Sequence, residues 1–596
     1  MGDQARSRRA FLRGSSAAAV SVAAVLAGAG TGYGSPKGGR SVAILGGGVA
    51  GLTAAHELIE RGFSVTVYER NVLGGKARSI GVPGSGKDGR PDLPGEHGFR
   101  FFPGFYRNLP DTMGRIPFPG NQNGTWDNLT RASAVLMSRM GGRADLTIPF
   151  PFPLPTNPPP LTPASFLASV VAMFQTLLRL PPHEAAFAAE KLLVFVTSCD
   201  ERRRGQWDDV TWADYTRTAW FSGEYDKLFA DGLIRNLVAS KSKDASTYSI
   251  GVVAEAVFWS LMGLGNESGS SVDRVLCGST NEMWLDPWIG YLRAKGVAFR
   301  VGWAADALEI GGGRVTAASV VNKAGERRRV EADWFLSAMP VERAMKLLSP
   351  AVLAADPGLA GIRELGTDWM VGLQFFLNRE LPITPGHVNY EDSAWAITSI
   401  SQQQFWKRPL DGYGDGTVRD CLSTILSDWG RPGNFTAKTA RQCTPEQIAA
   451  ETWAVMKAHL NDTGQAVLED DMLHSWFLDP AITGAGTSDV DNDTPLFIQK
   501  PGTWKARPTA RTAIPNLFFA GDWIRTNINV TTMEGANEAA RQAVNGVLDA
   551  SGSAEPRCSV TPLWVNPAFD AFKAADRGMY QLGLPHAFDL ADPRRP

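Results

Sequence analysis

The sequence is poor in cysteine and carries almost no net charge, and each shortage excludes a class of protein. Five cysteines are scattered through 596 residues without any Cys-x-x-Cys spacing, so neither a metal framework nor a disulfide scaffold is expected. Basic and acidic residues nearly balance, at 59 and 61, so the basic stripe of a nucleic-acid-binding protein is missing. We therefore expect no metal and no nucleic acid as partners.

Long hydrophobic runs are also scarce, and the one near the amino terminus is too short to cross a membrane. The weakly apolar run from Ala17 to Ala29 falls short of the ~20 residues of a membrane helix. It follows Arg8-Arg9 and ends in an A-x-A cleavage pattern at 27–29. This start, residues 1–35, resembles a twin-arginine signal and implies the export machinery as a partner and an exported or cell-envelope location. A disordered basic tail or an uncleaved anchor is the alternative.

The most informative motif begins at the end of a predicted strand, Val42 to Leu45. The pattern Gly46-x-Gly48-x-x-Gly51 follows directly, then an apolar-periodic helix at 52–61 and a second strand at 64–68 that ends on Glu69. In dinucleotide-binding units the three glycines make the turn, admit the pyrophosphate and pack helix on strand, and the acid binds a ribose hydroxyl. The sequence therefore predicts a dinucleotide site rather than a glycine-rich structural loop.

A second glycine element, Leu73 to Ser79, follows the second strand and offers Lys76 and Arg78 to phosphate oxygens. Here the chain resembles the flavin-containing amine oxidase and phytoene desaturase superfamily, in which a similar segment, one residue longer, contacts FAD. The run Gly95 to Asn108 resembles the flavin-facing segment of the carotenoid-desaturase and hydroxysqualene-dehydroxylase branch; a surface loop with buried aromatics is the alternative. His97 in this run is a candidate proton donor, although a lone histidine is more often a packing residue.

The middle of the chain predicts an inserted substrate domain. The proline-rich stretch 149–163 is a loop, because proline lacks an amide donor. The uncharged apolar helix expected at 164–180 either dips into a membrane interface or packs inside a helical domain. Further helical patterns at 184–196, 212–221 and 249–264 make 117–269 an α-rich insertion. Residues 346–499 complete this domain with an antiparallel sheet and one helix, 445–459, capped by Thr444.

The pattern of residues 281–340 predicts a second segment of the nucleotide-binding domain. The element N-E-M-W-L-D-P-W at 281–288 leads into a helix that ends at Lys295, and strands follow at 297–301, 305–310, 315–322 and 330–339. The resemblance implies that this series covers the adenine and that the backbone at Ala305 contacts it.

A closing motif joins a buried strand, Leu517 to Phe519, to a helix that begins at Met533. Asp522 suits ribityl or phosphate-side hydroxyls, and the free amides of the helix start favour negative charge on a ring. In the resembling family the corresponding residues hold FAD. The segment 501–505, P-G-T-W-K, resembles a flavin-lining segment, so Trp504 is expected to wall the cavity, whereas Lys505 is equally well explained as a surface charge. No cysteine lies between 443 and 558, so FAD is expected to be noncovalent.

These features predict an α/β protein with a Rossmann-type FAD-binding domain (36–116, 270–345 and 500–550), an inserted mixed, helix-rich α+β substrate domain (117–269 and 346–499) and a C-terminal tail (551–596). The resemblance implies an FAD-dependent oxidoreductase that desaturates, dehydroxylates or isomerises a lipophilic, polyisoprenoid substrate. An exported amine oxidase that produces hydrogen peroxide and a noncatalytic flavoprotein or lipid carrier remain as alternatives. The catalytic candidates are Trp504, Lys505 and His97; the cofactor-binding candidates are Gly46, Gly48, Ala50, Gly51, Glu69, Arg70, Gly75, Lys76, Arg78, Gly98, Phe99, Ala305, Gly521, Asp522, Met533 and Gly535.

Overall fold

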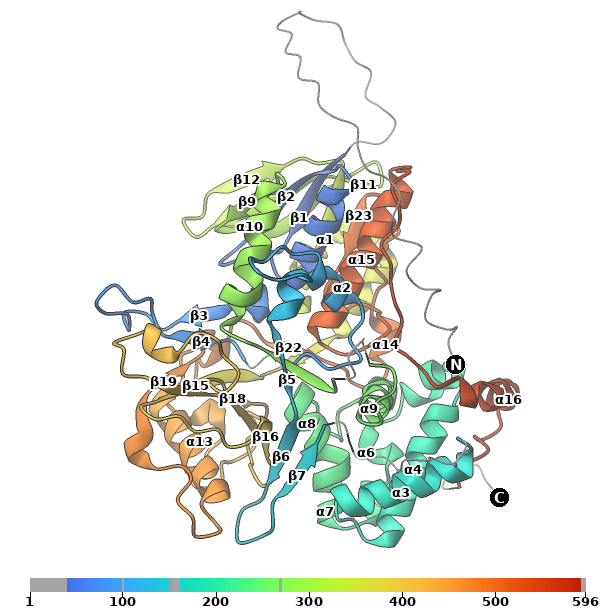
Figure 1. The fold of residues 1–596 in the computed structure, drawn as a ribbon. Helices are drawn as coiled ribbons and strands as arrows, with labels where there is room; N and C mark the ends of the chain where they lie inside the picture. Colours follow the sequence, from blue (N-terminus) through green and yellow to red (C-terminus); the bar gives the residue numbers. More distant parts are fainter. Residues whose placement is uncertain (1–39, 99–100, 151, 153–160, 267–270, 591–596) are drawn as a thin grey trace, which may run out of the picture. The chain divides into compact units, whose positions relative to one another are not determined.

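Five parallel strands form the central sheet of the nucleotide-binding half (Figure 1). The computed structural model describes residues 40–98, 101–150, 152, 161–266 and 271–590, all within the unit Gly38–Pro596. The strand order is β23-β13-β1-β2-β9, and every neighbouring pair is parallel. Strands from both ends of the chain therefore meet in one sheet: β1 (Ser41–Leu45), β2 (Ser64–Glu69), β9 (Ala298–Val301), β13 (Trp334–Ser337) and β23 (Leu517–Phe519).

Helices pack on this sheet, which explains why its strands are apolar along their length. Residues 42–45 of β1 are buried, as is typical of a parallel strand covered on both faces. Helix α1 (Val49–Glu60) begins at Gly48 and packs against α15 (Met533–Ala550) and α10 (Asp286–Ala294). The expected strand, turn, helix and strand unit is thus present, and the Rossmann-type fold is confirmed.

A three-stranded antiparallel sheet leads from β9 back to β13. Its strands are β10 (Trp303–Gly311), β11 (Arg314–Asn322) and β12 (Arg327–Val330). Gly312 and Gly313 form the first turn with φ of +58° and +75°, a left-handed conformation that favours glycine. The strand expected at 330–339 is divided, because β12 ends at Val330 and β13 begins at Trp334 and pairs with β1 instead.

A seven-stranded mixed sheet forms the second half and includes strands that the sequence did not reveal. The segment 117–269 was expected to be α-rich, yet β6 pairs in parallel with β16 and antiparallel with β7, while β5 (Leu129–Ala132) pairs with β8 (Asp273–Leu276). Strand β16 is remote in sequence from β6, and β8 is remote from β5, so local patterns do not reveal these two pairings. The order is β19 (Leu473–Leu478), β15 (Val371–Leu377), β18 (Asp420–Leu426), β17 (Ile397–Ser401), β16 (Gly386–Tyr390), β6 (Ala134–Ser138) and β7 (Leu146–Pro149).

One helix packs on this sheet as expected. Helix α13 (Pro445–Leu460) begins at Thr444, whose side chain accepts a hydrogen bond from the Gln447 amide. Thr444 is therefore the N-cap that the sequence indicated.

Helices of the inserted segment form a separate layer, and several differ in length from the expected ones. Helix α3 (Pro163–Leu177) stops before Arg179, which has a left-handed φ of +50°. The helix expected at 212–221 is only α6 (Trp212–Tyr215) followed by a single 3₁₀ turn. The remaining long helices are α4 (Pro182–Thr197), α8 (Gly232–Val238) and α9 (Thr247–Leu261). Among the described residues, no helix combines the length and the apolarity needed to cross a membrane.

The C-terminal segment is part of this helical layer. It contains α16 (Asp570–Gln581), which packs against α4 and α5 (Asp200–Arg202). Buried Asp576 accepts hydrogen bonds of 2.9 Å from the Arg202 side chain and from the Cys199 amide. Lys191, also buried, pairs with Asp589 at 2.5 Å. The segment expected to be a tail is therefore anchored by buried ion pairs.

Candidate active site

The main cleft lies at the carboxyl ends of β1, β13 and β23, where parallel α/β sheets place their ligands. It has a volume of about 340 Å³. One wall consists of the turns that follow these strands, and apolar side chains of the inserted helices and of the mixed sheet line the other. Because only β13 separates β1 from β23, the turns at Gly46 and Gly521 start two strand spacings apart, about 10 Å.

The first glycine turn has the geometry that its motif predicts. Gly46 has φ of +110°, and a Cβ on Gly51 would lie 2.0 Å from the Gly46 carbonyl oxygen, so α1 packs on the turn only through glycine. Gly48 is the N-cap of α1 and contributes no capping side chain, which leaves the first amides of the helix for a ligand. Gly46, Gly48 and Ala50 line the cleft, whereas Gly51 lies behind it.

The second glycine turn lies against the first. The Gly74 amide donates to the Gly47 carbonyl at 2.8 Å, and a Cβ on Gly75 would lie 2.8 Å from the Gly48 Cα atom. Lys76 and Arg78 also line the cleft, and the Arg78 guanidinium donates to the Gly75 carbonyl at 2.6 Å. Two glycine turns with adjacent cations form a cradle that fits a pyrophosphate.

Glu69 and Arg70 lie at the far end of this wall. The Glu69 carboxylate accepts from the Gly47 amide at 2.9 Å and from the Asn71 amide at 2.8 Å, which holds the turn beside the cleft. Arg70 pairs with Asp493 at 2.6 Å, and Arg343 reaches the same carboxylate at 2.5 Å. Burial acts to raise the pKa of Asp493, but the hydrogen bond and the charges of these arginines outweigh it and lower the pKa. Asp493 is a site residue that the sequence did not reveal.

Two carboxylates face the middle of the cleft. Gly521 has φ of +135° and places Asp522 at the end of β23. Burial raises the pKa of Asp522 against the opposing charge of Lys76, and burial also raises the pKa of Glu342. Both carboxylate oxygens of Glu342 are buried and have no hydrogen-bond partner among the described residues. A hydroxyl-rich ligand such as the ribityl and ribose part of FAD fits such acceptors.

The start of α15 completes this wall. The Thr532 side chain accepts from the Gly535 amide at 2.9 Å, so Gly535 serves the helix cap and does not line the cleft, while Met533 does. The buried Glu534 points elsewhere: its carboxylate accepts from the Asn108 amide at 2.7 Å and the Leu109 amide at 2.8 Å. It thus caps α2 (Asn108–Gly114) from the other end of the chain.

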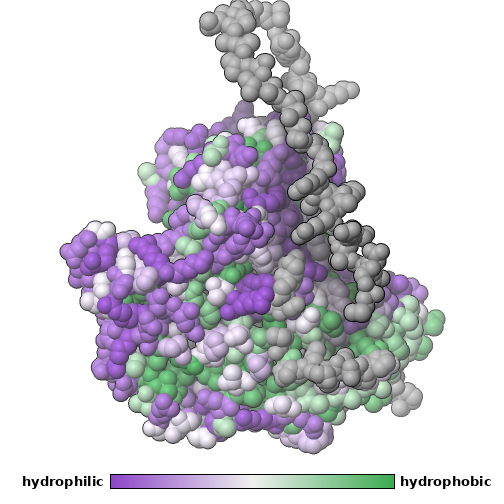
Figure 2. All heavy atoms as spheres, in the orientation of Figure 1, coloured by the Kyte–Doolittle hydropathy of each residue, from purple (hydrophilic) through white to green (hydrophobic). Residues whose placement is uncertain are grey.

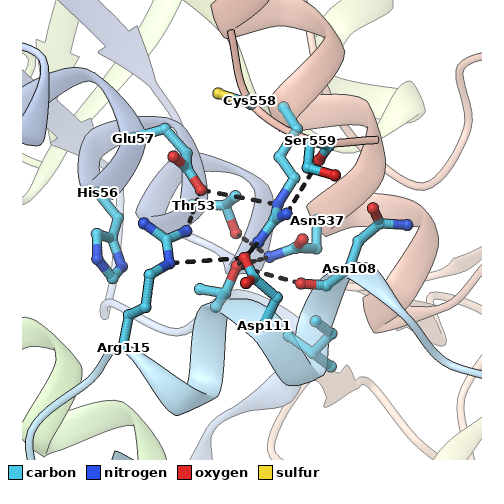
Figure 3. A network of polar contacts seen from close by, with 12 residues as sticks. Thr53, His56, Glu57, Asn108, Asp111, Arg115, Asn537, Cys558 and Ser559 are labelled. Carbon is cyan, nitrogen blue, oxygen red and sulfur yellow. Dashed lines mark hydrogen bonds and ion pairs between the residues drawn. The ribbon is translucent and has the colours of Figure 1, made fainter. Parts of the chain in front are cut away.

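A buried polar network behind the cleft holds α1, α2 and α15 together (Figure 3). The side-chain amide of Asn537 donates to Thr53 on α1 at 2.9 Å and to Thr112 on α2 at 2.8 Å. Arg541 donates to Thr112 at 2.8 Å and to the Ser559 carbonyl at 3.0 Å. The second of these hydrogen bonds links the C-terminal segment to the network. The network fixes the direction of α15, whose first turn lines the cleft.

The opposite wall is apolar. Its residues come from the run 101–106, from α9, from the mixed sheet and from the loop after β23. Tyr106 is buried there, and burial raises the pKa of its hydroxyl far above the ordinary value. The apolar side chains of this wall include Phe101, Phe105, Val253, Val257, Met370, Ile425, Ile528 and Val530, and Leu496 of β22 (Leu496–Ile498) lines the cleft as well.

His97 is the titratable group on the cleft that is best placed for proton transfer. Its Nδ1 atom pairs with the buried Asp479 next to β19, and no described residue provides a partner for Nε2. Burial acts to raise the pKa of Asp479, but the charge and hydrogen bond of His97 outweigh it and lower the pKa. Asp479 therefore orients the ring, and Nε2 is the nitrogen available to a ligand.

The remaining expected residues divide between the cleft and other parts of the molecule. Gly98 lines the cleft, Phe99 lies outside the described residues, and Ala305 on β10 does not line the cleft. Trp504 was expected to wall the substrate cavity, but it does not line the cleft, because α14 (Thr503–Ala506) turns toward residues 204–209. There Trp504 faces a second cavity and Lys505 pairs with Asp209 at 2.7 Å on the surface.

Metal chemistry has no support in the part of the chain that the structure describes. No group of three or more histidine, cysteine, aspartate or glutamate side chains is arranged to hold a metal there. All five cysteines are free and buried, and none lines the cleft. The glycine turns and the carboxylate acceptors of the cleft fit a dinucleotide.

The fold and the cleft define a dinucleotide-dependent oxidoreductase with a Rossmann-type domain. The sequence model of the family described as flavin containing amine oxidoreductase matches residues 49–548. The chain belongs to this family and is an FAD-dependent oxidoreductase, as the sequence indicated.

Named relatives place the chain more closely. Zeta-carotene desaturase of Arabidopsis thaliana is 24% identical over 555 residues, which are 87% of this chain and 86% of that protein. Carotenoid phi-ring synthase of Streptomyces griseus is 25% identical over 526 residues, which are 86% and 88% of the two chains. The expected carotenoid-desaturase branch is therefore confirmed.

Solved structures share the fold. Cyclohexylamine oxidase from Brevibacterium oxydans superposes with a TM-score of 0.56 at 14% identity and covers 87% of this chain and 100% of that one. An oxidoreductase from Methanosarcina mazei gives a TM-score of 0.54 at 14% identity, with 85% and 100% covered. At such identities the likeness concerns the fold alone.

Proposed function

We propose that this protein desaturates, dehydroxylates or isomerises a lipophilic, polyisoprenoid substrate with noncovalently held FAD. The observation that carries the proposal is the apolar wall opposite the glycine turns, in which side chains such as Val253, Met370 and Ile425 leave no fixed charge for an amine to pair with. The names of the carotenoid-acting relatives support the same substrate class.

The residues that would hold FAD come from four turns. The glycine turns at Gly46 and Gly75 suit the pyrophosphate, Glu69 suits a ribose hydroxyl, and Glu342 and Asp522 suit hydroxyls of the ribityl chain. When bound, FAD supplies the acceptor or donor of a hydride or of electrons. The absence of a cysteine on the described cleft supports noncovalent binding.

The chain's own residues then bind the substrate, exclude water and move a proton. The apolar wall removes hydrocarbon from water, worth about 25 cal/mol per Å² of buried apolar surface. His97, held at Nδ1 by Asp479, takes up or returns a proton at Nε2. Glu534 and Asn537 keep the start of α15 in place and take no part in the chemistry.

We also propose that the protein is exported and touches membranes peripherally. The twin-arginine start lies outside the described residues, so its support is the sequence alone. For membrane contact, the exposed side of α3 carries no charge, and Leu582, Leu584 and Leu590 at the C-terminal end are largely exposed. Figure 2 shows hydrophobic surface in the region where α3 and α16 lie in Figure 1.

The test begins with the purified, full-length protein. Heat denaturation should release FAD into solution, and a flavin that stays attached to the polypeptide would contradict noncovalent binding. Under anaerobic conditions a carotenoid or squalene-type compound should bleach the flavin spectrum. Bleaching by amines alone, with hydrogen peroxide formed in air, would favour an amine oxidase. The absence both of bleaching by any compound and of conversion of any compound by the oxidised or the reduced protein would favour a carrier.

Variants separate cofactor binding from chemistry. Asp522→Ala and Glu69→Ala should each lower the FAD content, whereas Lys505→Ala, a surface control paired with Asp209, should not. His97→Gln should keep its FAD and lose turnover by about 10²-fold or more. Full occupancy in both carboxylate variants would contradict the assigned cofactor wall, and unchanged turnover in His97→Gln would remove histidine from the mechanism.

A further inference from the structure

A second cavity of about 580 Å³ lies behind the flavin cleft and has no role in the proposed function. The two cavities share helix α9 as a wall: Val252 and Glu255 line the second cavity, and Val253 and Val257 line the cleft. The loop after β23 separates them as well. The C-terminal segment closes the other side through residues 562–565 and the first turns of α16.

Three cations line this cavity without a close carboxylate partner. Arg525 donates to the carbonyl oxygens of Trp504 and Lys505 at 2.9 Å each, and no described carboxylate forms a salt bridge with it. Arg204 makes only long contacts, 3.4 Å to the Tyr248 hydroxyl and 3.5 Å to Asp200. Lys573 forms no salt bridge with any described residue. The cavity therefore presents positive charge that the protein does not neutralise at close range.

The acids near the cavity compensate these cations only in part. Glu255 is already paired with Arg203 at 2.9 Å, and both side chains are buried. Asp200 and Asp570 are exposed at the rim, where water weakens their influence. Burial and the charge of Arg204 lower the pKa of Arg525, and burial and the charge of Arg203 lower the pKa of Lys573. An anion bound in the cavity would stabilise the charged forms of Arg525 and Lys573 and so raise both pKa values.

Trp504 holds two of the cations in position. The guanidinium groups of Arg204 and Arg525 lie 5.6 Å and 5.4 Å from its ring centre, and Tyr248 packs edge-on at 5.2 Å. Planar guanidinium groups fixed on an aromatic face are preorganised to bind phosphate oxygens in pairs. Trp504, which was expected to wall the substrate cavity, thus supports a different site.

We propose that this second cavity binds a ligand that carries a phosphate group, held by Arg204, Arg525 and Lys573. Three cations suit a dianion better than a single carboxylate. The volume leaves room for a phosphorylated small molecule or for the head group of a phospholipid, and the two sources share the same contact chemistry. This site is independent of the proposed redox reaction.

The binding experiment uses the full-length protein saturated with FAD, so that the cofactor cradle cannot take up the probe. Calorimetric titration with pyrophosphate, in a low-salt buffer free of phosphate, should give one site per chain. Sedimentation with phosphatidylcholine vesicles, with and without phosphatidic acid, distinguishes the source. Binding of pyrophosphate without vesicle binding indicates a soluble ligand, and retention by phosphatidic acid vesicles alone indicates a lipid head group. Absence of binding in both arms would overturn the proposal.

Single substitutions locate the site. Arg204→Gln and Lys573→Gln remove charges with few structural contacts and should each weaken binding about 10-fold. Arg419→Gln is the control, because this arginine is exposed and pairs with Asp411 at 3.2 Å on another surface. Equal affinity in parent and cavity variants would overturn the proposal, as would an equal loss in the control, because either result indicates nonspecific charge attraction.

Discussion

The two walls of the flavin cleft are built from different parts of the polypeptide. On the nucleotide side the contacts are backbone turns, and Gly46, Gly51 and Gly75 allow distances that a Cβ atom would prevent. On the substrate side the contacts are apolar side chains from α9, the mixed sheet and the loop after β23. A substitution in the first wall moves backbone, whereas one in the second changes only the shape and polarity of a surface.

This difference predicts that cofactor and substrate binding respond separately to mutation. The nucleotide wall tolerates almost no added volume, since its neighbours are main-chain atoms. The substrate wall includes flexible side chains such as that of Met370, which repack at modest cost. Such a division allows related proteins to keep one cofactor while they bind different substrates.

The largest effect is expected from Gly51→Ala, which tests how rigid the nucleotide wall is. The new methyl group would lie 2.0 Å from the Gly46 carbonyl oxygen, so α1 must shift, and we expect a loss of about 3 kcal/mol in stability together with most of the FAD. Flavin absorbance and urea unfolding measure both. Gly290→Ala in α10 is the control: it meets no atom within 4 Å and should stabilise by about 0.5–1 kcal/mol. A Gly51 variant that keeps its FAD would refute the comparison.

A smaller effect is expected from Glu534→Ala, which tests whether the end of the chain supports the nucleotide wall. The substitution leaves the amides of Asn108 and Leu109 without their acceptor, at a cost of about 2–3 kcal/mol. Hydrogen exchange should speed up in α2 and at the start of α15. Glu555→Ala, an exposed residue in the same C-terminal third, serves as the control. Unchanged hydrogen exchange in α2 would show that the cap formed by Glu534 does not stabilise this helix.

Val253→Ser tests the substrate wall. It replaces an apolar contact by a hydroxyl and should lower kcat/KM for a lipophilic substrate about 10-fold, with unchanged FAD content. Val252→Ser is a matched control, because the neighbouring residue on α9 is equally half-buried but faces the second cavity. Equal losses in both variants would indicate damage to the helix rather than to the substrate wall.

The smallest effect concerns pH and lies in the substrate half alone. Burial raises the pKa of Glu391 to about 8, against the lowering influence of Arg139 and other cations. A carboxyl group with a raised folded pKa destabilises the protein progressively as pH rises from its unfolded pKa of about 4.3 toward 8. Glu391→Gln should therefore melt close to the parent at pH 5 and measurably higher than the parent at pH 8. A gap that is constant with pH would contradict the titration.

The sequence allowed much of the nucleotide wall to be predicted because its rules are local. The turn at Gly46, the acid at Glu69 and the strand before Gly521 each follow from a few adjacent residues, and each lies where it was expected. Asp479, the partner of His97, could not be predicted because it is remote from His97 in the sequence. Glu342 could not be predicted because it belongs to no recognised motif. Trp504 was misplaced because a resemblance over five residues does not determine which way a short helix turns.

The mixed sheet shows the same limit on a larger scale. Strand β6 pairs with β16 across about half the chain, so neither strand alone signals its neighbour. The buried network of Asn537 and Arg541 joins three helices from both ends of the chain. Such contacts depend on the complete fold, and a pattern read along one segment does not contain them.

Because β23 lies late in the sequence, the nucleotide site is completed late during synthesis of the chain. Its place in the sheet is beside β13, and the turn after it, with the start of α15, supplies the last part of the cofactor wall. A growing chain therefore emerges from the ribosome with an unfinished nucleotide site for most of translation, and long-range pairing of this kind is slow. A polypeptide that stops before Met533 lacks the start of α15, so the cofactor wall is complete only when most of the chain has been synthesised.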